Sequence, residues 1–166
     1  MSLPDAERLA ESDPYQFQWW ALGLVGARPV EEKKGADRGI DGRIYFHDEK
    51  KNAKTKQIII QVKSGGVSSR QIRDLSGVLQ RENAQIGVFI TMLSPTREMR
   101  KEAASGGFYN SPWLNSKHPR LQILTIEEIL NGRGIDYPLP KDTSVTFKKA
   151  KSAAIEKADQ KKIFEE

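Results

Sequence analysis

The sequence predicts an α/β domain in which a mixed central β-sheet lies between layers of helices. Helical and strand patterns alternate along the chain in the order helix, strands, helix, strand, helix, strand. Crossover helices between neighbouring strands produce this order. A length of 166 residues, with 37% hydrophobic and 30% charged residues, suits one globular domain with a single core.

The first helix is predicted in DPYQFQWWALGLVGA, residues 13–27. Asp13 is placed to cap its amino end, and Pro14 suits its first turn. Apolar side chains then recur at helical spacing, at Phe17, Trp20, Ala21 and Leu24. We expect the helix to end near Gly26 and the two tryptophans to pack in the core.

Three strands are predicted next, beginning with a short edge strand in ARPVEEKK and a glycine-rich turn in GADRGIDG. IDGRIYFH alternates, with Ile40, Ile44 and Phe46 on one face and Asp41 on the other. The charged stretch 48–56 is predicted to be a hairpin tip. The isoleucine run in KQIIIQVKS indicates a central strand that is covered on both faces.

The second half of the domain repeats a helix–strand pattern. SSRQIRDLSGVLQREN predicts a helix with a capping box between Ser68 and Gln71. Its apolar stripe consists of Ile72, Leu75, Val78 and Leu79. IGVFITM predicts a strand, SPTREMRKEAASGGF a helix, LQILTI a last strand, and EEILNG a short final helix.

The composition narrows the chemistry that the chain can perform. The formal net charge of +5 favours a polyanionic partner. The absence of cysteine, with only His47 and His118, excludes thiolate catalysis and argues against zinc centres and histidine triads. Neither a membrane-spanning stretch nor a signal peptide is apparent in the sequence, so we expect a cytoplasmic protein.

The organisation predicted along the chain has three parts. Residues 1–12 form an amino-terminal extension, residues 13–137 form the globular domain, and residues 138–166 form a lysine-rich tail, disordered or partly helical. The abrupt beginning and the charged tail suit a fragment of a longer protein.

Polar side chains interrupt the central strand QIIIQVKSGG at Gln61 and Lys63. Because side chains alternate along a strand, these two share one face. A hairpin would lay the strand that begins at Asp41 antiparallel beside them. A carboxylate, an amide and a lysine then converge at one edge of the sheet. A simpler alternative is a Lys–Asp ion pair across the strands, with Asp41 serving the turn.

These segments resemble a known nuclease family. GADRGIDG followed by IIIQVKSGG is similar to the PD-(D/E)xK nuclease superfamily, in particular to its Mrr-like branch, in which glutamine commonly occupies the position of Gln61. The resemblance extends over residues 13–132, including the helices and strands on either side of the motif. It implies a restriction-endonuclease-like three-layer sandwich with a mixed central sheet.

The resemblance also implies roles for the residues at the strand end. Asp41, the side-chain oxygen of Gln61 and the backbone carbonyl of Val62 would bind Mg²⁺ or Mn²⁺, ions that prefer oxygen ligands. Lys63 would hold or deprotonate the attacking water and offset charge on the phosphorane. Gln18 matches a glutamate that the family's first helix often directs toward this site.

The expected nucleic-acid contacts follow the same strand. Gly65 and Gly66 allow close approach of a phosphate backbone, and Arg70 and Arg73 begin the next helix. We therefore expect double-stranded DNA as the partner.

Three functions are compatible with these residues. The leading one is a metal-dependent DNA endonuclease of type II-like restriction character, from a restriction–modification setting. A methyltransferase domain in a longer protein and a homodimer on DNA are the further partners expected. The second function is a catalytically silent DNA-binding module with the nuclease fold, favoured by the amides at Gln18 and Gln61. The third is a protein-interaction domain, suggested by the lysine-rich tail.

Overall fold

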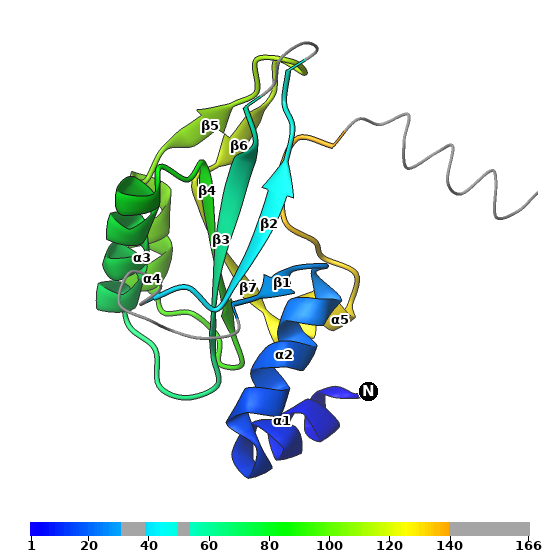
Figure 1. The fold of residues 1–166 in the computed structure, drawn as a ribbon. Coiled ribbons are helices and arrows are strands. Elements are labelled where there is room, and N and C mark those ends of the chain that lie inside the picture. The colour runs from blue at the N-terminus through cyan, green and yellow to red at the C-terminus, as the bar shows by residue number, and fades with distance from the viewer. Residues whose placement is uncertain (31–38, 50–53, 140–166) are drawn as a thin grey trace, which may run out of the picture.

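The computed structural model describes residues 1–30, 39–49 and 54–139. A five-stranded sheet in the order β1-β2-β3-β4-β7 forms its centre, with helices on both faces (Figure 1). The predicted α/β sandwich with a mixed central sheet is confirmed. None of the described helices is long and apolar enough to cross a membrane.

The central sheet combines an antiparallel half with a parallel half. Its strands are β1 (Arg28–Pro29), β2 (Gly42–Phe46), β3 (Lys56–Lys63), β4 (Ile86–Thr91) and β7 (Leu121–Thr125). Strands β1, β2 and β3 pair antiparallel, whereas β3, β4 and β7 pair parallel. Strand β3 is therefore the middle strand, as its isoleucine run predicts. Ile58, Ile59 and Ile60 are completely buried.

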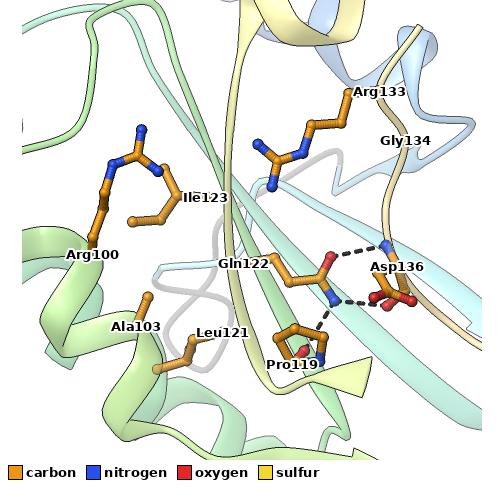
Figure 2. Close-up of a pocket in the computed structure, with 9 residues that line it drawn as sticks. All are labelled: Arg100, Ala103, Pro119, Leu121, Gln122, Ile123, Arg133, Gly134 and Asp136. Atoms are coloured by element: carbon orange, nitrogen blue, oxygen red, sulfur yellow. Dashed lines mark hydrogen bonds between the residues drawn. The ribbon is translucent and has the colours of Figure 1, made fainter. Parts of the chain in front are cut away.

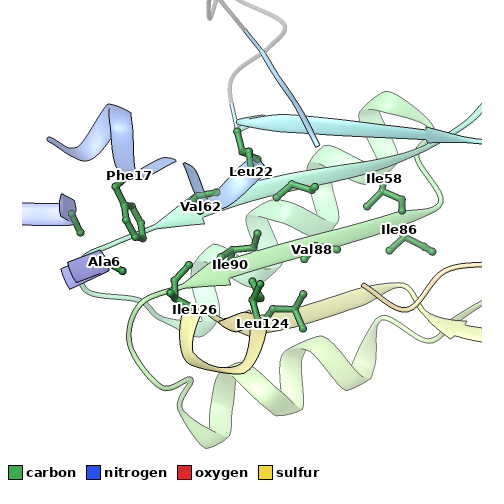
Figure 3. Close-up of a cluster of buried hydrophobic side chains, with 14 of the residues drawn as sticks. Ala6, Phe17, Leu22, Ile58, Val62, Ile86, Val88, Ile90, Leu124 and Ile126 are labelled. Atoms are coloured by element: carbon green, nitrogen blue, oxygen red, sulfur yellow. The ribbon is translucent and has the colours of Figure 1, made fainter. Parts of the chain in front are cut away.

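Three helices cover one face of the sheet: α1 (Leu3–Ser12), α2 (Pro14–Leu24) and the short α5 (Ile126–Leu130). Figure 3 shows the apolar side chains that fill this layer, among them Phe17, Leu22 and Val62. Asp13 caps α2 as predicted, since its Oδ1 accepts the Gln16 N–H at 3.1 Å.

Helix α1 is absent from the sequence prediction, which treats residues 1–12 as an extension. Ser2 and Asp5 form its capping box, and two small side chains, Ala6 and Ala10, pack in the core with α2. Leu3 and Leu9 pack beside these alanines, so the four residues recur at helical spacing. The sequence signal is present but short, and half of it is alanine.

The opposite face is covered by α3 (Ser69–Glu82) and α4 (Arg97–Ser105). The predicted stripe of Ile72, Leu75, Val78 and Leu79 is buried against the sheet. The predicted capping box is present, with the Ser68 N–H donating to Gln71 Oε1 at 2.8 Å. This layer fixes the beginning of α3 directly after the end of β3.

Several details differ from the sequence prediction. Trp20 packs against the core, but Trp19 is 53% exposed because it lies on the outer side of α2. Ile40 packs on the α3 side of the sheet, away from Ile44, because the regular alternation of β2 begins only at Gly42.

A small second sheet of β5 (Phe108–Asn110) and β6 (Lys117–Pro119) is also absent from the prediction. Its strands are too short to show an alternating pattern. The first half of the predicted glycine-rich turn, the centre of the hairpin tip and the tail from residue 140 lie outside the described residues.

Candidate functional site

The corner where β2 begins beside the end of β3 contains Asp41. Gly42, the first residue of β2, pairs with Ile60, so Val62 lies beyond the amino end of β2. The Asp41 N–H donates to the Ile60 carbonyl at 2.9 Å. The Asp41 Oδ2 accepts the Val62 N–H at 2.8 Å, and only 4% of Asp41 is exposed. The carboxylate thus replaces the backbone acceptor that β2 would otherwise supply.

Gln61 is buried in the same corner. Its Nε2 donates to the carbonyl of Gly39 at 2.5 Å, and this bond ties the loop before Asp41 to β3. Gly39 has a φ of +85°, and a Cβ there would lie 3.1 Å from Gln61 Nε2 and 3.0 Å from the Val78 side chain. A glycine is required here by both conformation and space.

Lys63 ends β3 and is exposed. Its carbonyl accepts the Met92 N–H at 3.1 Å, which extends the β3–β4 pairing. Ile58, Ile60 and Val62 belong to the core layer of α2, whereas Ile59 belongs to the layer of α3. Gln61 and Lys63 therefore point to the α3 side. The structure brings Asp41, Gln61 and Val62 into one hydrogen-bonded corner with Lys63 at its rim.

Gln18 lies elsewhere. It is half-buried on α2, the helix that covers the face opposite to the Gln61 and Lys63 side chains. Its side chain forms no hydrogen bond with another described residue. Glu31 and Asp37, which could supply a further carboxylate, lie outside the described residues.

The predicted nucleic-acid contacts surround the end of β3. Gly65 and Gly66 are exposed, and a Cβ on either would meet open space. Arg70, in the first turn of α3, is exposed and forms no ion pair within the described part of the chain. Arg73 Nε lies 3.7 Å from Glu102 Oε1, with 61% of the Arg73 side chain exposed. Arg70 is thus more available than Arg73 for contact with a phosphate group.

The donor atoms of the corner are a poor match for a protein-held divalent cation. Asp41 supplies the corner's carboxylate, and its Oδ2 already accepts the Val62 N–H. Within the described residues, no three His, Cys, Asp or Glu side chains group as a metal site. Mg²⁺ sites usually combine one or two carboxylates with substrate phosphates. The corner alone therefore does not fit a resident metal.

A second polar cluster, near the other end of β2, is absent from the sequence prediction. Asp48 is completely buried. Its Oδ2 accepts the Tyr109 hydroxyl and its Oδ1 the Ser111 hydroxyl, each at 2.5 Å. Lys56 Nζ donates to the Tyr109 hydroxyl at 2.9 Å. Burial, the hydrogen bond to Asp48 and nearby negative charge raise the pKa of the Tyr109 phenol well above its usual range.

His118 lies in β6 and is buried, although the sequence around it, NSKHPR, is typical of a loop. Its Nε2 lies 2.7 Å from the Ser116 hydroxyl and its Nδ1 lies 2.7 Å from Asp136 Oδ1. Both ring nitrogens thus have hydrogen-bond partners, and the ring holds the segment after α5 against the small sheet.

The fold has counterparts among solved structures. The DNA modification-dependent restriction endonuclease AspBHI superposes with a TM-score of 0.57 and 18% identity over 77% of this chain and 33% of the other. The MspJI restriction endonuclease, solved in complex with a 27-mer oligonucleotide, superposes with a TM-score of 0.51 and 18% identity. The match covers 76% of this chain and 29% of the MspJI chain. This chain spans about a third of each neighbour's length.

A search of curated proteins found no match to the chain. A family model, NACHT-associated inactive Restriction Endonuclease 1, matches residues 15–131. The matched segment runs from the first turn of α2 to the end of α5 and contains the whole corner of Asp41, Gln61 and Lys63. With most of its length matched, the chain belongs to the NACHT-associated inactive restriction endonuclease family.

Proposed function

We propose that this chain is a DNA-binding module that keeps the restriction-endonuclease-like fold but does not cleave DNA. The bond from Gln61 to the carbonyl of Gly39 carries the proposal. A carboxylate at this position could not donate to a carbonyl oxygen unless it were protonated. The amide that departs from the (D/E)xK pattern therefore has a structural role that an ionised acid cannot fill.

Asp41 supports the same interpretation. Its Oδ2 accepts the Val62 N–H, which would otherwise be a buried donor at the end of the pairing with β2. An unsatisfied buried donor costs about 1–3 kcal/mol. Both polar side chains that the motif directs into the corner thus stabilise the hairpin. The word "inactive" in the family's name agrees with this use of the two side chains.

The surface around the corner suits a phosphate backbone. Lys63 and Arg70 are exposed on the α3 side, and the exposed backbone of Gly65 and Gly66 lies between them in the sequence. Lysine, arginine and exposed backbone N–H groups are the usual phosphate contacts. The neighbour MspJI was solved with an oligonucleotide, and the net charge of this chain is +5. We infer that double-stranded DNA binds at this end of β3.

The family's name associates it with NACHT proteins, and this chain spans only part of its structural neighbours. We infer that the module serves a longer protein as its DNA-recognition part, with the partner domain a NACHT domain in preference to a methyltransferase.

A salt titration of DNA binding tests the proposal. The affinity of the chain for a labelled duplex is measured by fluorescence anisotropy at increasing salt concentrations. Removing one phosphate contact reduces the slope of log affinity against log salt by about one. We expect this reduction for Lys63→Ala and Arg70→Ala. Arg97→Ala, at an exposed arginine at the beginning of α4, is the matched control. An affinity independent of salt would contradict the proposal and favour a protein-interaction domain.

A second candidate is the Mrr-like endonuclease of the PD-(D/E)xK type. Asp41 beside the Val62 backbone, with Lys63 exposed at the same strand end, favours it. In this case Mg²⁺ or Mn²⁺ would take oxygens from Asp41, Gln61 and Val62, and DNA phosphate would complete the shell.

Mn²⁺ titration monitored by NMR distinguishes the candidates, because the paramagnetic ion broadens nearby amide signals. The endonuclease predicts that Gln61 and Val62 broaden selectively when duplex is present, and that Asp41→Asn abolishes the effect. The silent module predicts no selective broadening with or without duplex.

A further inference from the structure

A cleft of about 320 Å³ lies along β7, the edge strand farthest from β1. Figure 2 shows β7 running between α4 on one side and the segment 133–136 on the other. The floor is apolar at Ala103, Leu121 and Ile123, and Arg100 and Arg133 approach from the two walls. Strand β4 separates β7 from β3 and the Asp41 corner.

The backbone of β7 presents open hydrogen-bonding groups to this cleft. Gly87 pairs with Leu121, and its N–H donates to the Arg120 carbonyl at 2.7 Å. In a parallel ladder a residue bonds to the two neighbours of its partner. Residues 120, 122 and 124 therefore face β4, while the N–H and C=O groups of Leu121 and Ile123 face outward. These outward groups have no hydrogen-bond partner in the described part of the chain.

The wall opposite α4 is held in place by Gln122, which is 7% exposed. Its Nε2 donates to the carbonyls of Pro119 and Asp136 at 2.9 and 2.7 Å. Its Oε1 accepts the Asp136 N–H at 2.9 Å. The segment after α5 is thus fixed on one side of the edge and leaves the outward groups of β7 uncovered.

The charges that line the cleft differ in availability. Arg133 Nη1 lies 2.8 Å from Glu128 Oε1, and Asp136 Oδ1 lies 2.7 Å from His118 Nδ1. Arg100 is exposed on α4 and has no ion-pair partner among the described residues. An incoming carboxylate would find its counter-charge at Arg100, and a charge-assisted bond there is stronger than a neutral one.

We propose that β7 binds an extended acidic peptide segment of a partner protein, which adds to the sheet as a sixth strand. Exposed strand edges recognise peptides through main-chain hydrogen bonds, and pockets beside the edge select alternate side chains. Here Leu121 and Ile123 supply the main-chain groups, the apolar floor accepts aliphatic side chains, and Arg100 selects a carboxylate. This interaction does not involve the DNA surface proposed at the end of β3.

Binding of a designed peptide to the full chain tests the proposal. The probe is a fluorescent, end-capped peptide of sequence TVTDTVT, whose valines and aspartate share one face of an extended strand, and the control peptide is TVTKTVT. We expect saturable binding of the acidic peptide and at least about tenfold weaker binding of the basic one. Arg100→Glu is expected to weaken acidic-peptide binding by about tenfold or more. Arg97→Glu makes the same charge change on the same helix outside the cleft, so its effect should stay within about twofold.

Amide hydrogen exchange supplies a second, independent readout. In the free chain, the Leu121 and Ile123 amides should exchange faster than those of Gln122 and Leu124, and the acidic peptide should protect the first pair alone. Absence of saturable binding, an unchanged affinity in Arg100→Glu, or protection of Leu121 and Ile123 in the free chain would overturn the proposal. Displacement of the peptide by a single-stranded oligonucleotide would also overturn it, by assigning the arginines to nucleic acid.

Discussion

Two buried aspartates lie near opposite ends of β2 and illustrate two uses of a carboxylate. Asp41 accepts the backbone N–H of Val62 and lies beside the exposed end of β3. Asp48 accepts the hydroxyls of Tyr109 and Ser111 and is completely enclosed. Asp41 joins β2 to β3, whereas Asp48 joins the end of β2 to the small β5–β6 sheet.

The comparison shows that a buried, hydrogen-bonded acid is weak evidence for catalysis. Asp48 is more deeply buried than Asp41 and has two hydroxyl donors. Burial and bonding alone would therefore make Asp48 the better catalytic candidate, yet its role is structural. What distinguishes Asp41 is its surroundings, because Lys63 and the Gly65–Gly66 backbone are exposed next to it. In our account these exposed groups bind DNA, and Asp41 and Gln61 hold them in position.

Removing the enclosed carboxylate should have the largest effect on stability. Asp48→Ala leaves the buried Ser111 hydroxyl and the half-buried Tyr109 hydroxyl without their acceptor, and we expect a loss of about 3 kcal/mol in the free energy of unfolding. Urea denaturation measures this loss. Glu49→Ala is the control, since the half-exposed Glu49 carboxylate forms a long ion pair with Lys56 at 3.7 Å and should change stability by less than about 0.5 kcal/mol. Equal effects would show that the Asp48 cluster is not a structural junction.

Asp41→Ala should have a smaller effect, because it removes the acceptor of a backbone donor, the Val62 N–H. We expect a loss of about 2 kcal/mol by the same denaturation. Asp41→Asn retains an acceptor oxygen and should lose less than half of this. If Asp41→Ala were as stable as the natural chain, the Val62 bond would not hold the corner.

The pH dependence of the stability of Gln61→Glu tests whether position 61 must donate a hydrogen bond to the Gly39 carbonyl. The introduced carboxylate would face the Gly39 carbonyl in a buried position, so its pKa in the folded state should rise above the unfolded value of about 4.3. The protonated acid can donate and the ionised acid cannot, so the variant should lose stability relative to the natural chain as the pH rises from about 4.3 toward neutral. We expect a loss of about 1–2 kcal/mol at pH 7. A loss that is the same at every pH would contradict the donor role of Gln61.

Tyr109→Phe should have the smallest effect, about 1 kcal/mol at neutral pH for one hydrogen bond. The pKa of the folded phenol is raised above its ordinary value of 10.0. The natural chain should therefore lose stability as the pH rises above 10, where the unfolded phenol ionises first. The phenylalanine variant lacks this group, so the stability difference should narrow above that pH. A constant difference would show that Asp48 does not hold the phenol neutral.

Much of the fold follows from hydrophobic pattern and capping. Strand β3, helix α3 and the parallel strands β4 and β7 have long apolar runs or stripes, and the structure places them as predicted. Helix α1 has a short apolar stripe in which only Ala6 and Ala10 are buried, with Leu3 and Leu9 beside them, and this signal was missed. The β5–β6 sheet has three residues in each strand, too few to show an alternating pattern. Trp19 shows the opposite error: a large aromatic side chain can lie on the outer side of a helix.

The corner was predictable as a set of residues but not as a set of bonds. Strand alternation places Gln61 and Lys63 on one face, and the hairpin brings Asp41 beside them. The partners of these side chains, the Gly39 carbonyl and the Val62 N–H, are backbone groups. Their positions depend on where β2 begins and on the positive φ of Gly39, which sequence pattern does not give.

Cleavage of supercoiled plasmid is the most direct test of the central claim that this corner binds DNA without cutting it. Methylated and unmethylated plasmids are incubated with the natural chain or Lys63→Ala, in Mg²⁺ or Mn²⁺, at protein concentrations that saturate binding. We predict that the natural chain binds both plasmids and that nicking stays at the level of protein-free DNA. Metal-dependent nicking by the natural chain that Lys63→Ala abolishes would contradict the claim and establish the endonuclease.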